Sequence, residues 1–143
     1  SPSVVCTPVE ASLIKYSINS FLATKVTFFN ELNKLCEKYG TSFLTVSRGV
    51  MADQRIGFSH TRVPGYDGKK GFGGACFPKD TIAFTKFAEA NDAPLKVLAT
   101  AIEVNNTIRA EYETSDREKE SNVDYGQAKE KQQDQDDGSV VGE

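Results

Sequence analysis

The stretch VEASLIKYSINSFLATKVTFFNELNKLCEKY, Val9–Tyr39, decides the fold of this 143-residue chain. Its apolar residues recur mostly in steps of three and four, the spacing that places side chains on one face of an α-helix. These residues are Leu13, Ile14, Ile18, Phe21, Leu22, Val26, Phe29, Leu32, Leu35 and Cys36. Thr7, Pro8 and Glu10 match the pattern of a helix start, and Gly40 matches that of a helix end. The stretch therefore predicts one long amphipathic helix.

This helix is too long and too apolar to lie exposed on the surface of a small monomer. Contiguous exposed apolar patches usually mark a surface that binds a partner. We therefore predict that the helix packs inside its own subunit and also against a second copy of the chain. The expected assembly is a homodimer formed through this long N-terminal helix.

The rest of the ordered chain is also expected to be helical. Ser42–Met51 predicts a shorter helix capped by Ser42, although its apolar residues would also suit a strand. Residues 53–74 are rich in Gly, Asp and Pro and predict a loop of a length that is usually functional or disordered. Asp80–Ala90 and the segment from Pro94 to about Tyr112 predict two further helices. The expected fold class is all-α, with one long helix, three shorter helices and a long Gly-rich loop.

The end of the chain differs in composition from the rest. Residues 113–143 hold ten acidic and four basic residues, a net charge of −6, whereas residues 1–112 carry a net charge of +3. The later segment has too few apolar side chains to offset the entropy lost on ordering. We therefore expect a helical domain over residues 1–112 and a largely disordered acidic tail over residues 113–143.

Composition also narrows the cellular setting. The three cysteines are odd in number and lack paired spacing, which argues against a disulfide framework and for a reducing, cytoplasmic setting. A single histidine, His60, and the lack of a CxxC pair leave no metal site to predict. No apolar run approaches the roughly 20 residues of a membrane span. The mildly basic part lacks a nucleic-acid-binding motif, so neither membrane nor nucleic acid is an expected partner.

The stretch GFGGACFPKD, Gly71–Asp80, carries the clearest sign of chemistry. Its glycines allow backbone conformations that a side chain would forbid, and Cys76 follows them just before a predicted helix. A helix N-terminus and a nearby Lys79 both favour the thiolate form, so Cys76 suits a nucleophile. A buried structural thiol fits the local sequence equally well. Asp80 suits a catalytic carboxylate and also a helix N-cap.

Other polar residues have both a functional and an ordinary interpretation. Lys15 and Asn19 are four residues apart on the long helix, so they share a face and could stabilise an oxyanion together. From spacing alone, a surface lysine that covers apolar neighbours is the favoured interpretation of Lys15. Arg55 could bind a hydroxyl-rich or phosphorylated ligand, but a surface salt bridge is the commoner outcome. The glycine run lacks the spacing of a phosphate-binding loop.

Taken together, residues from about 9 to 112 resemble the central domain of the UDP-glucose/GDP-mannose dehydrogenase family. The resemblance rests on EASLIKYSIN at 10–19, Asn30-Glu31, Leu35-Cys36-Glu37, Asp53-x-Arg55-Ile56-Gly57, GFGGACFPKD at 71–80, and Val104-Asn105. The glycine–cysteine motif is specific, and the Lys-x-x-x-Asn pair stands at the expected distance from it. The family fold is helical and dimerises through the long helix.

The resemblance implies an NAD-dependent oxidation of a nucleotide-sugar C6 alcohol to a carboxylate, with UDP-glucose preferred to GDP-mannose as substrate. It implies that Cys76 is the nucleophile that forms a thiohemiacetal and then a thioester. Lys15 and Asn19 would stabilise the oxyanions, and Asp80 would help to activate the hydrolytic water.

The resemblance also implies a set of binding residues. Phe72, Gly73 and Arg55 would line the sugar site, with Arg55 reaching in from the other subunit. Lys79 would lie toward the NAD cofactor. The family's NAD-binding Rossmann domain and its second nucleotide-binding domain have no counterpart in this sequence. We therefore expect a fragment that is inactive alone, or that acts with separately encoded domains. The alternative is a dimerisation or interaction module derived from such an enzyme.

Overall fold

The computed structural model describes residues 3–126, and this range contains five helices and no strand. The helices are α1 (Pro8–Tyr39), α2 (Phe43–Met51), α3 (Cys76–Ala90), α4 (Lys96–Arg109) and α5 (Asp116–Glu120). The predicted all-α fold with one long helix is confirmed. Helix α4 is shorter at both ends than the helix expected from Pro94 to Tyr112.

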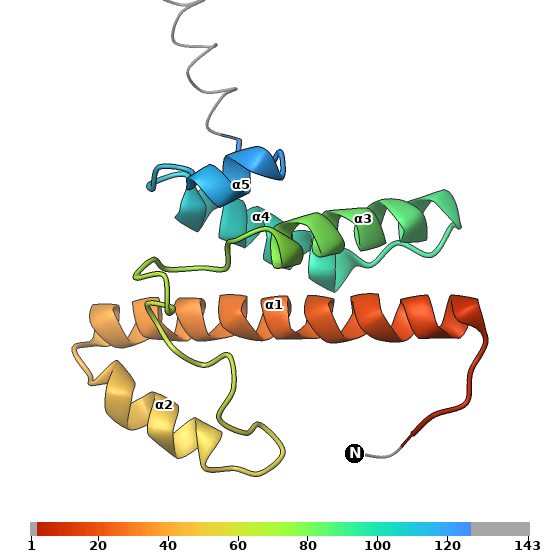
Figure 1. Cartoon of the computed structure of the whole chain (residues 1–143). Coiled ribbons are helices and arrows are strands. Elements are labelled where there is room, and N and C mark those ends of the chain that lie inside the picture. The colour runs from red at the N-terminus through yellow and green to blue at the C-terminus, as the bar shows by residue number, and fades with distance from the viewer. Residues whose placement is uncertain (1–2, 127–143) are drawn as a thin grey trace, which may run out of the picture.

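Helix α1 is the element on which the others are arranged (Figure 1). The expected capping box is present: Thr7 Oγ1 accepts a hydrogen bond from the Glu10 N–H, and Glu10 Oε1 accepts one from the Thr7 N–H. Gly40 ends the helix with a left-handed φ of 76°. Helices α3 and α4 pack on one side of α1 and α2 on another. Within the described range, neither α1 nor any other helix has an apolar stretch suited to crossing a membrane.

Helix α3 begins four residues earlier than the sequence predicted, at Cys76 rather than Asp80. Pro78 favours a later start when it is treated as a helix breaker, but a proline is tolerated in the first turn. The amide groups there have no partner within the helix, so the missing N–H costs little. Asp80 therefore lies inside α3, and its expected alternative role as N-cap is wrong because Ala75 occupies that position.

The long connection from α2 to α3, residues 52–75, joins the two sides of α1. Near its start, Lys25 Nζ on α1 donates a hydrogen bond to the Ile56 carbonyl at 2.7 Å. Near its end, the Gly71 N–H donates to Asn30 Oδ1, also on α1, at 2.9 Å. The predicted long loop is confirmed, and α1 fixes it at both ends.

Part of the segment that was expected to be largely disordered, residues 113–126, has a defined structure. Helix α5 forms there with a capping box between Ser115 and Glu118. Glu118 and Tyr125 are only 2% and 5% exposed, so this segment buries side chains that composition alone marked as solvated. The rest of the acidic tail, residues 127–143, lies outside the described residues.

Candidate functional site

Cys76 and Asp80 share one face at the start of α3. Cys76 is the first residue of the helix and is exposed. Asp80 follows four residues later, about one helical turn along, so both side chains lie on the same side of α3. At this position the thiol sits beside the unpaired amide groups and the positive end of the helix dipole.

A hydrogen bond between side chains joins this face of α3 to α1. Asn19 Nδ2 donates to Asp80 Oδ2 at 2.7 Å, although the two residues are 61 positions apart in the sequence. An acceptor that carries charge makes this one of the stronger kinds of hydrogen bond. The structure thus brings together two of the residues that the sequence predicted to act together.

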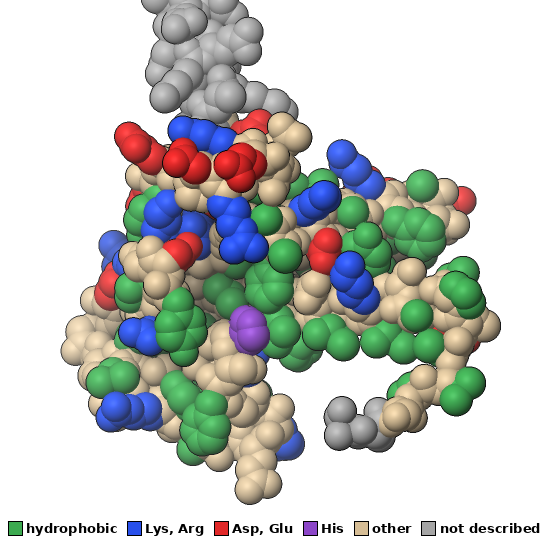
Figure 2. Space-filling view, in the orientation of Figure 1, with side chains coloured by type: hydrophobic (Ala, Val, Ile, Leu, Met, Phe, Trp, Pro, Cys, Tyr) green, Lys and Arg blue, Asp and Glu red, His purple; other side chains and the backbone are tan. Residues whose placement is uncertain are grey.

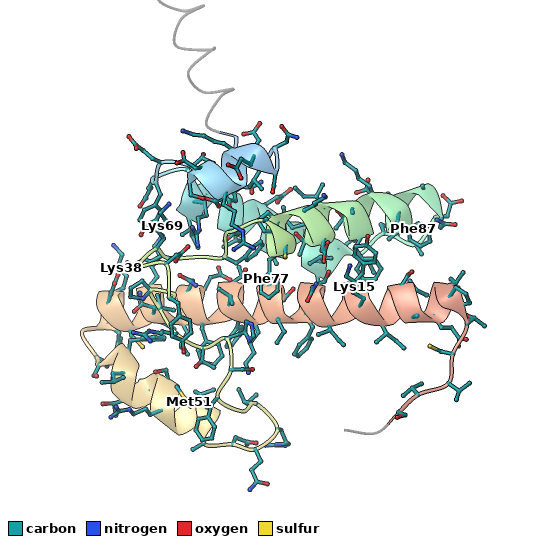
Figure 3. All side chains as sticks on the ribbon, in the orientation of Figure 1. Lys15, Lys38, Met51, Lys69, Phe77 and Phe87 are labelled. Carbon is teal, nitrogen blue, oxygen red and sulfur yellow. The ribbon has the colours of Figure 1, made fainter. Side chains whose placement is uncertain are left out.

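Lys15 lies one turn before Asn19 on α1, on the side that faces α3 (Figure 3). Next to it, Tyr16 stacks on Phe84 of α3 with ring centroids 5.9 Å apart, which fixes how α1 meets α3 at this level. Lys15 Nζ lies 5.8 Å from the Tyr16 ring centroid, a cation–π contact, and the side chain remains exposed. An exposed ammonium one turn from Asn19 is free to reach a ligand placed beside Asp80.

Side chains of other elements fix the backbone of the glycine loop, which we define as residues 71–74. Asn105 Oδ1 accepts a hydrogen bond from the Phe72 N–H at 2.7 Å, and Asn105 Nδ2 donates to the Phe72 carbonyl at 2.9 Å. Arg109 Nη2 donates to the Gly71 carbonyl at 3.1 Å and pairs with Asp67 Oδ2 at 2.8 Å. The shape of the loop before Cys76 is therefore set by α4 as well as α1.

Two glycines of this loop are required for different reasons. Gly71 has a left-handed φ of 78°, and a Cβ there would lie 2.5 Å from Asn105 Oδ1. Gly73 has an ordinary φ, but a Cβ there would lie 2.5 Å from Arg109 Nη1. Real Cβ atoms essentially never approach this closely, so a larger residue at either position would force Asn105 or Arg109 to move.

The four predicted binding residues do not all lie near the predicted catalytic residues. Phe72 is 5% exposed and packs edge-on against Phe77, and Gly73 lies against Arg109. Lys79 is exposed on α3 and lines a groove of about 270 Å³.

Arg55 lies apart from this cluster. Its guanidinium forms two hydrogen bonds with the Asp53 carboxylate, at 3.0 and 2.7 Å, and its side chain is 88% exposed. This pairing lowers the pKa of Asp53. Among the residues that the structure describes, Arg55 has no hydrogen bond to Cys76, Asp80, Asn19 or Lys15. Within one copy of the chain, Arg55 therefore forms the surface salt bridge that was its ordinary interpretation.

The structure places His60, the single histidine of the chain, against the residue that follows Cys76. Its ring stacks on Phe77 with centroids 5.7 Å apart. Partial burial, together with the nearby Lys25, lowers the pKa of His60. The histidine is visible as the purple side chain near the middle of the face in Figure 2.

Sequence reasoning missed the residues that support the glycine loop. Asn105 is 1% and Arg109 2% exposed, so both are polar side chains buried on a helix. Their sequence signal was a polar residue on the otherwise apolar face of α4, at positions 105 and 109, four apart. Glu118, which accepts a hydrogen bond from the Gly74 N–H, could not be recognised from the sequence, because most of its neighbours in the sequence are also charged.

Comparisons with known proteins identify a family. Residues 9–107 match the model of the UDP-glucose/GDP-mannose dehydrogenase family, central domain. The chain is 46% identical over 108 residues to a UDP-glucose 6-dehydrogenase of Rhizobium meliloti (strain 1021), covering 74% of this chain and 23% of that protein. It is 40% identical over 107 residues to UDP-glucose 6-dehydrogenase TuaD of Bacillus subtilis (strain 168), covering 74% of this chain and 22% of that one.

A solved structure is also similar. It is a UDP-glucose dehydrogenase from the hyperthermophilic archaeon Pyrobaculum islandicum, with a TM-score of 0.66 and 37% identity. The match covers 75% of this chain and 24% of that one. The chain thus spans about a quarter of the length of the relatives it matches.

Proposed function

Because the chain belongs to the UDP-glucose/GDP-mannose dehydrogenase family, we propose that it is the catalytic-cysteine domain of a UDP-glucose 6-dehydrogenase. The family includes enzymes for more than one nucleotide sugar, and the proposal names UDP-glucose as the substrate. It is supported by curated relatives at 40–46% identity that carry that name. GDP-mannose is the alternative substrate within the same family.

The observation that carries the proposal is the hydrogen bond from Asn19 to Asp80. It links the Lys-x-x-x-Asn face of α1 to the Cys-x-x-x-Asp face of α3. A nucleophile, a carboxylate, an amide and an ammonium then surround one surface, which is the set that acyl chemistry at a carbonyl carbon requires.

Each residue has a step in the reaction. The Cys76 thiolate adds to the carbonyl carbon of the C6 aldehyde, and a C–S bond forms while the oxygen takes the negative charge. Lys15 and Asn19 donate to that oxygen. After the second oxidation the product is a thioester, and Asp80 accepts a proton from the attacking water. Breaking the C–S bond then releases the carboxylate and restores the thiolate.

NAD would supply the oxidant, with one NAD⁺ reduced for each of the two hydrides that leave C6. The described residues include helices and loops but no strand, so they do not supply the strand–helix phosphate cradle of a dinucleotide site. Lys79 is the residue that we assign toward the cofactor, since an exposed ammonium three residues from Cys76 suits a diphosphate. We therefore propose that the chain alone does not turn over, and that separate nucleotide-binding domains complete the enzyme.

We propose that two copies of the chain pair through α1. Six of its large apolar side chains, which we call the α1 stripe, remain exposed on α1. The stripe consists of Ile14, Ile18, Phe21, Phe28, Leu35 and Tyr39, which are 43–82% exposed. Four of them repeat every seven residues, the period of paired helices.

A cysteine nucleophile must stay a free thiol, and this requirement restricts the cellular compartment in which the protein can act. All three cysteines are free thiols, and a thiol nucleophile survives where the compartment is reducing. We propose a cytoplasmic location on this ground.

The test is the pH dependence of Cys76 alkylation by iodoacetamide, followed by mass spectrometry of its peptide. Cys6, which is also exposed, is the internal control in the same chain. A poised nucleophile titrates well below the ordinary value of about 8.5. An ordinary value at Cys76 would instead favour the interaction module with relic catalytic residues. Steady NADH formation by this chain with UDP-glucose and NAD would contradict the proposed inactivity.

A further inference from the structure

The last part of the glycine loop is held from beyond the region that matches the family. The Gly74 N–H donates to Glu118 Oε2 at 3.3 Å, across 44 positions of sequence. Glu118 lies on α5, and the family match ends at residue 107. This contact therefore belongs to a segment that the family comparison does not explain.

The carboxylate of Glu118 is buried, and hydrogen bonds hold both of its oxygens in place. It is 2% exposed, and a buried carboxylate is costly unless hydrogen bonds satisfy it. The hydroxyl of Tyr125, itself 5% exposed, donates to Oε2, and the Ser115 N–H donates to Oε1 at 3.0 Å. Burial acts to raise the pKa of Glu118, but these hydrogen bonds together outweigh it and lower the pKa.

The position of Gly74 makes this contact relevant to Cys76. Gly74 has a left-handed φ of 80°, and Ala75 is the N-cap of α3. The Gly74 amide is thus the last fixed point before the helix that starts at Cys76. Asn30 and Asn105 hold the beginning of the loop, whereas Glu118 holds its end.

We propose that Glu118 is a positioning residue for Cys76, acting through the Gly74 amide and supported by Tyr125. The proposal rests on the proposed function in that Cys76 is the nucleophile whose place matters. Segment 115–126 is then a brace for the catalytic loop. With the brace in place, the thiol stays at the N-terminus of α3, beside the positive end of the helix dipole.

The first measurement is amide hydrogen exchange in the full chain. Glu118→Ala should speed exchange at residues 71–76 by roughly 10- to 100-fold, which is the range for losing one hydrogen bond to a charged group. Exchange within α1 should stay unchanged. Glu120→Ala is the matched control, because it removes an exposed carboxylate from the same helix. Equal acceleration throughout the chain, or none at residues 71–76, would overturn the proposal.

The second measurement, the apparent pKa of Cys76, distinguishes a displaced Cys76 from the mere loss of the Glu118 charge. Removing a nearby carboxylate should by itself lower the apparent pKa of Cys76 in iodoacetamide alkylation. Loss of its place at the helix N-terminus should raise that pKa. We expect Glu118→Ala to raise it and Glu118→Gln, which keeps an oxygen for Gly74 but removes the charge, to lower it. A fall in Glu118→Ala, or no change, would contradict a positioning role.

Two further readouts keep the test decisive. If Glu118→Ala fails to fold, Tyr125→Phe removes only the supporting hydroxyl and should still speed exchange at residues 71–76 severalfold; unchanged exchange would overturn the proposal. If wild-type Cys76 titrates as an ordinary thiol, the proposed function fails. The exchange data would then still decide whether Glu118 holds the loop.

Discussion

Asn19 of α1 donates a hydrogen bond to Asp80 of α3 at 2.7 Å, and this contact joins the two helices that carry the proposed catalytic residues. Each residue also has a neighbour one turn away on its own helix, Lys15 on α1 and Cys76 on α3. This contact, together with the packing of α1 against α3, therefore brings four functional groups to one surface.

The strength of this contact can be measured by a double-mutant cycle with Asn19→Ala and Asp80→Ala. A hydrogen bond to a charged group contributes about 1.5–3 kcal/mol, and partial exposure of both residues favours the lower end. We expect a coupling energy of about 1–2 kcal/mol in urea unfolding. Lys15→Ala paired with Asp80→Ala serves as the control and should couple by less. Additive effects of Asn19→Ala and Asp80→Ala would show that the contact does not hold the helices together.

Two glycines with the same backbone conformation provide a matched pair. Gly40 and Gly71 have φ values of 76° and 78°, but a Cβ at Gly40 meets nothing within 4 Å, whereas one at Gly71 meets Asn105 Oδ1 at 2.5 Å. Gly40→Ala should cost about 1–2 kcal/mol through the left-handed conformation alone. Gly71→Ala should cost several kcal/mol, because it also breaks the support of Phe72. Equal midpoints in urea unfolding would refute this account of the loop.

Asn105 should be the residue in α4 least tolerant of change. It is 1% exposed, and its amide both donates to and accepts from the Phe72 backbone. Asn105→Asp keeps the acceptor but loses the donor and places a charge in the core, so we expect a loss of about 2–4 kcal/mol. Asn106→Asp, one position along the same helix and only partly buried, is the control. Similar stability losses for both variants would argue against a special role for Asn105.

Stability should depend on Glu118 in acid. The pKa of Glu118 is lower in the folded chain than its ordinary value of 4.5. The unfolded chain therefore binds a proton first as the pH falls, and the contribution of Glu118 to stability declines from about pH 4.5 down through the folded pKa. Above that range the contribution is fully present.

The measurement is the stability difference between wild type and Glu118→Gln across pH 2.5–7, from urea unfolding. The difference should be constant near neutral pH and should shrink in acid. A difference that grows as the pH falls would mean that the folded pKa is raised rather than lowered.

The α1 stripe should control assembly. Phe21 and Phe28 are 70% and 60% exposed, and a charged residue at either position would have to be buried in the proposed dimer. We expect Phe28→Glu to weaken self-association by about 100-fold or more, measured by analytical ultracentrifugation. Phe87→Glu is the control, since Phe87 is 54% exposed but lies on α3, outside the stripe (Figure 3). A wild-type chain that stays monomeric at high micromolar concentration would contradict the dimer.

The sequence by itself determined helices α1 to α4, because their signals are local, whereas α5 lies in a segment that was expected to be disordered. The apolar spacing of α1, the capping box at Thr7 and the left-handed Gly40 all depend on residues within one or two turns of each other. The motif around Cys76 is likewise contiguous, so its resemblance to the family could be read directly. The start of α3 was misplaced because Pro78 is as compatible with a first helical turn as with a break.

Only the tertiary structure decided which distant polar residues meet. Asn19 reaches Asp80, Asn105 reaches Phe72, and Glu118 reaches Gly74 across 33 to 61 positions, and no local pattern encodes those distances. Glu118 shows the reason most clearly. In the sequence it is one carboxylate among many in an acidic stretch, and only packing against the glycine loop separates a buried, hydrogen-bonded carboxylate from its solvated neighbours.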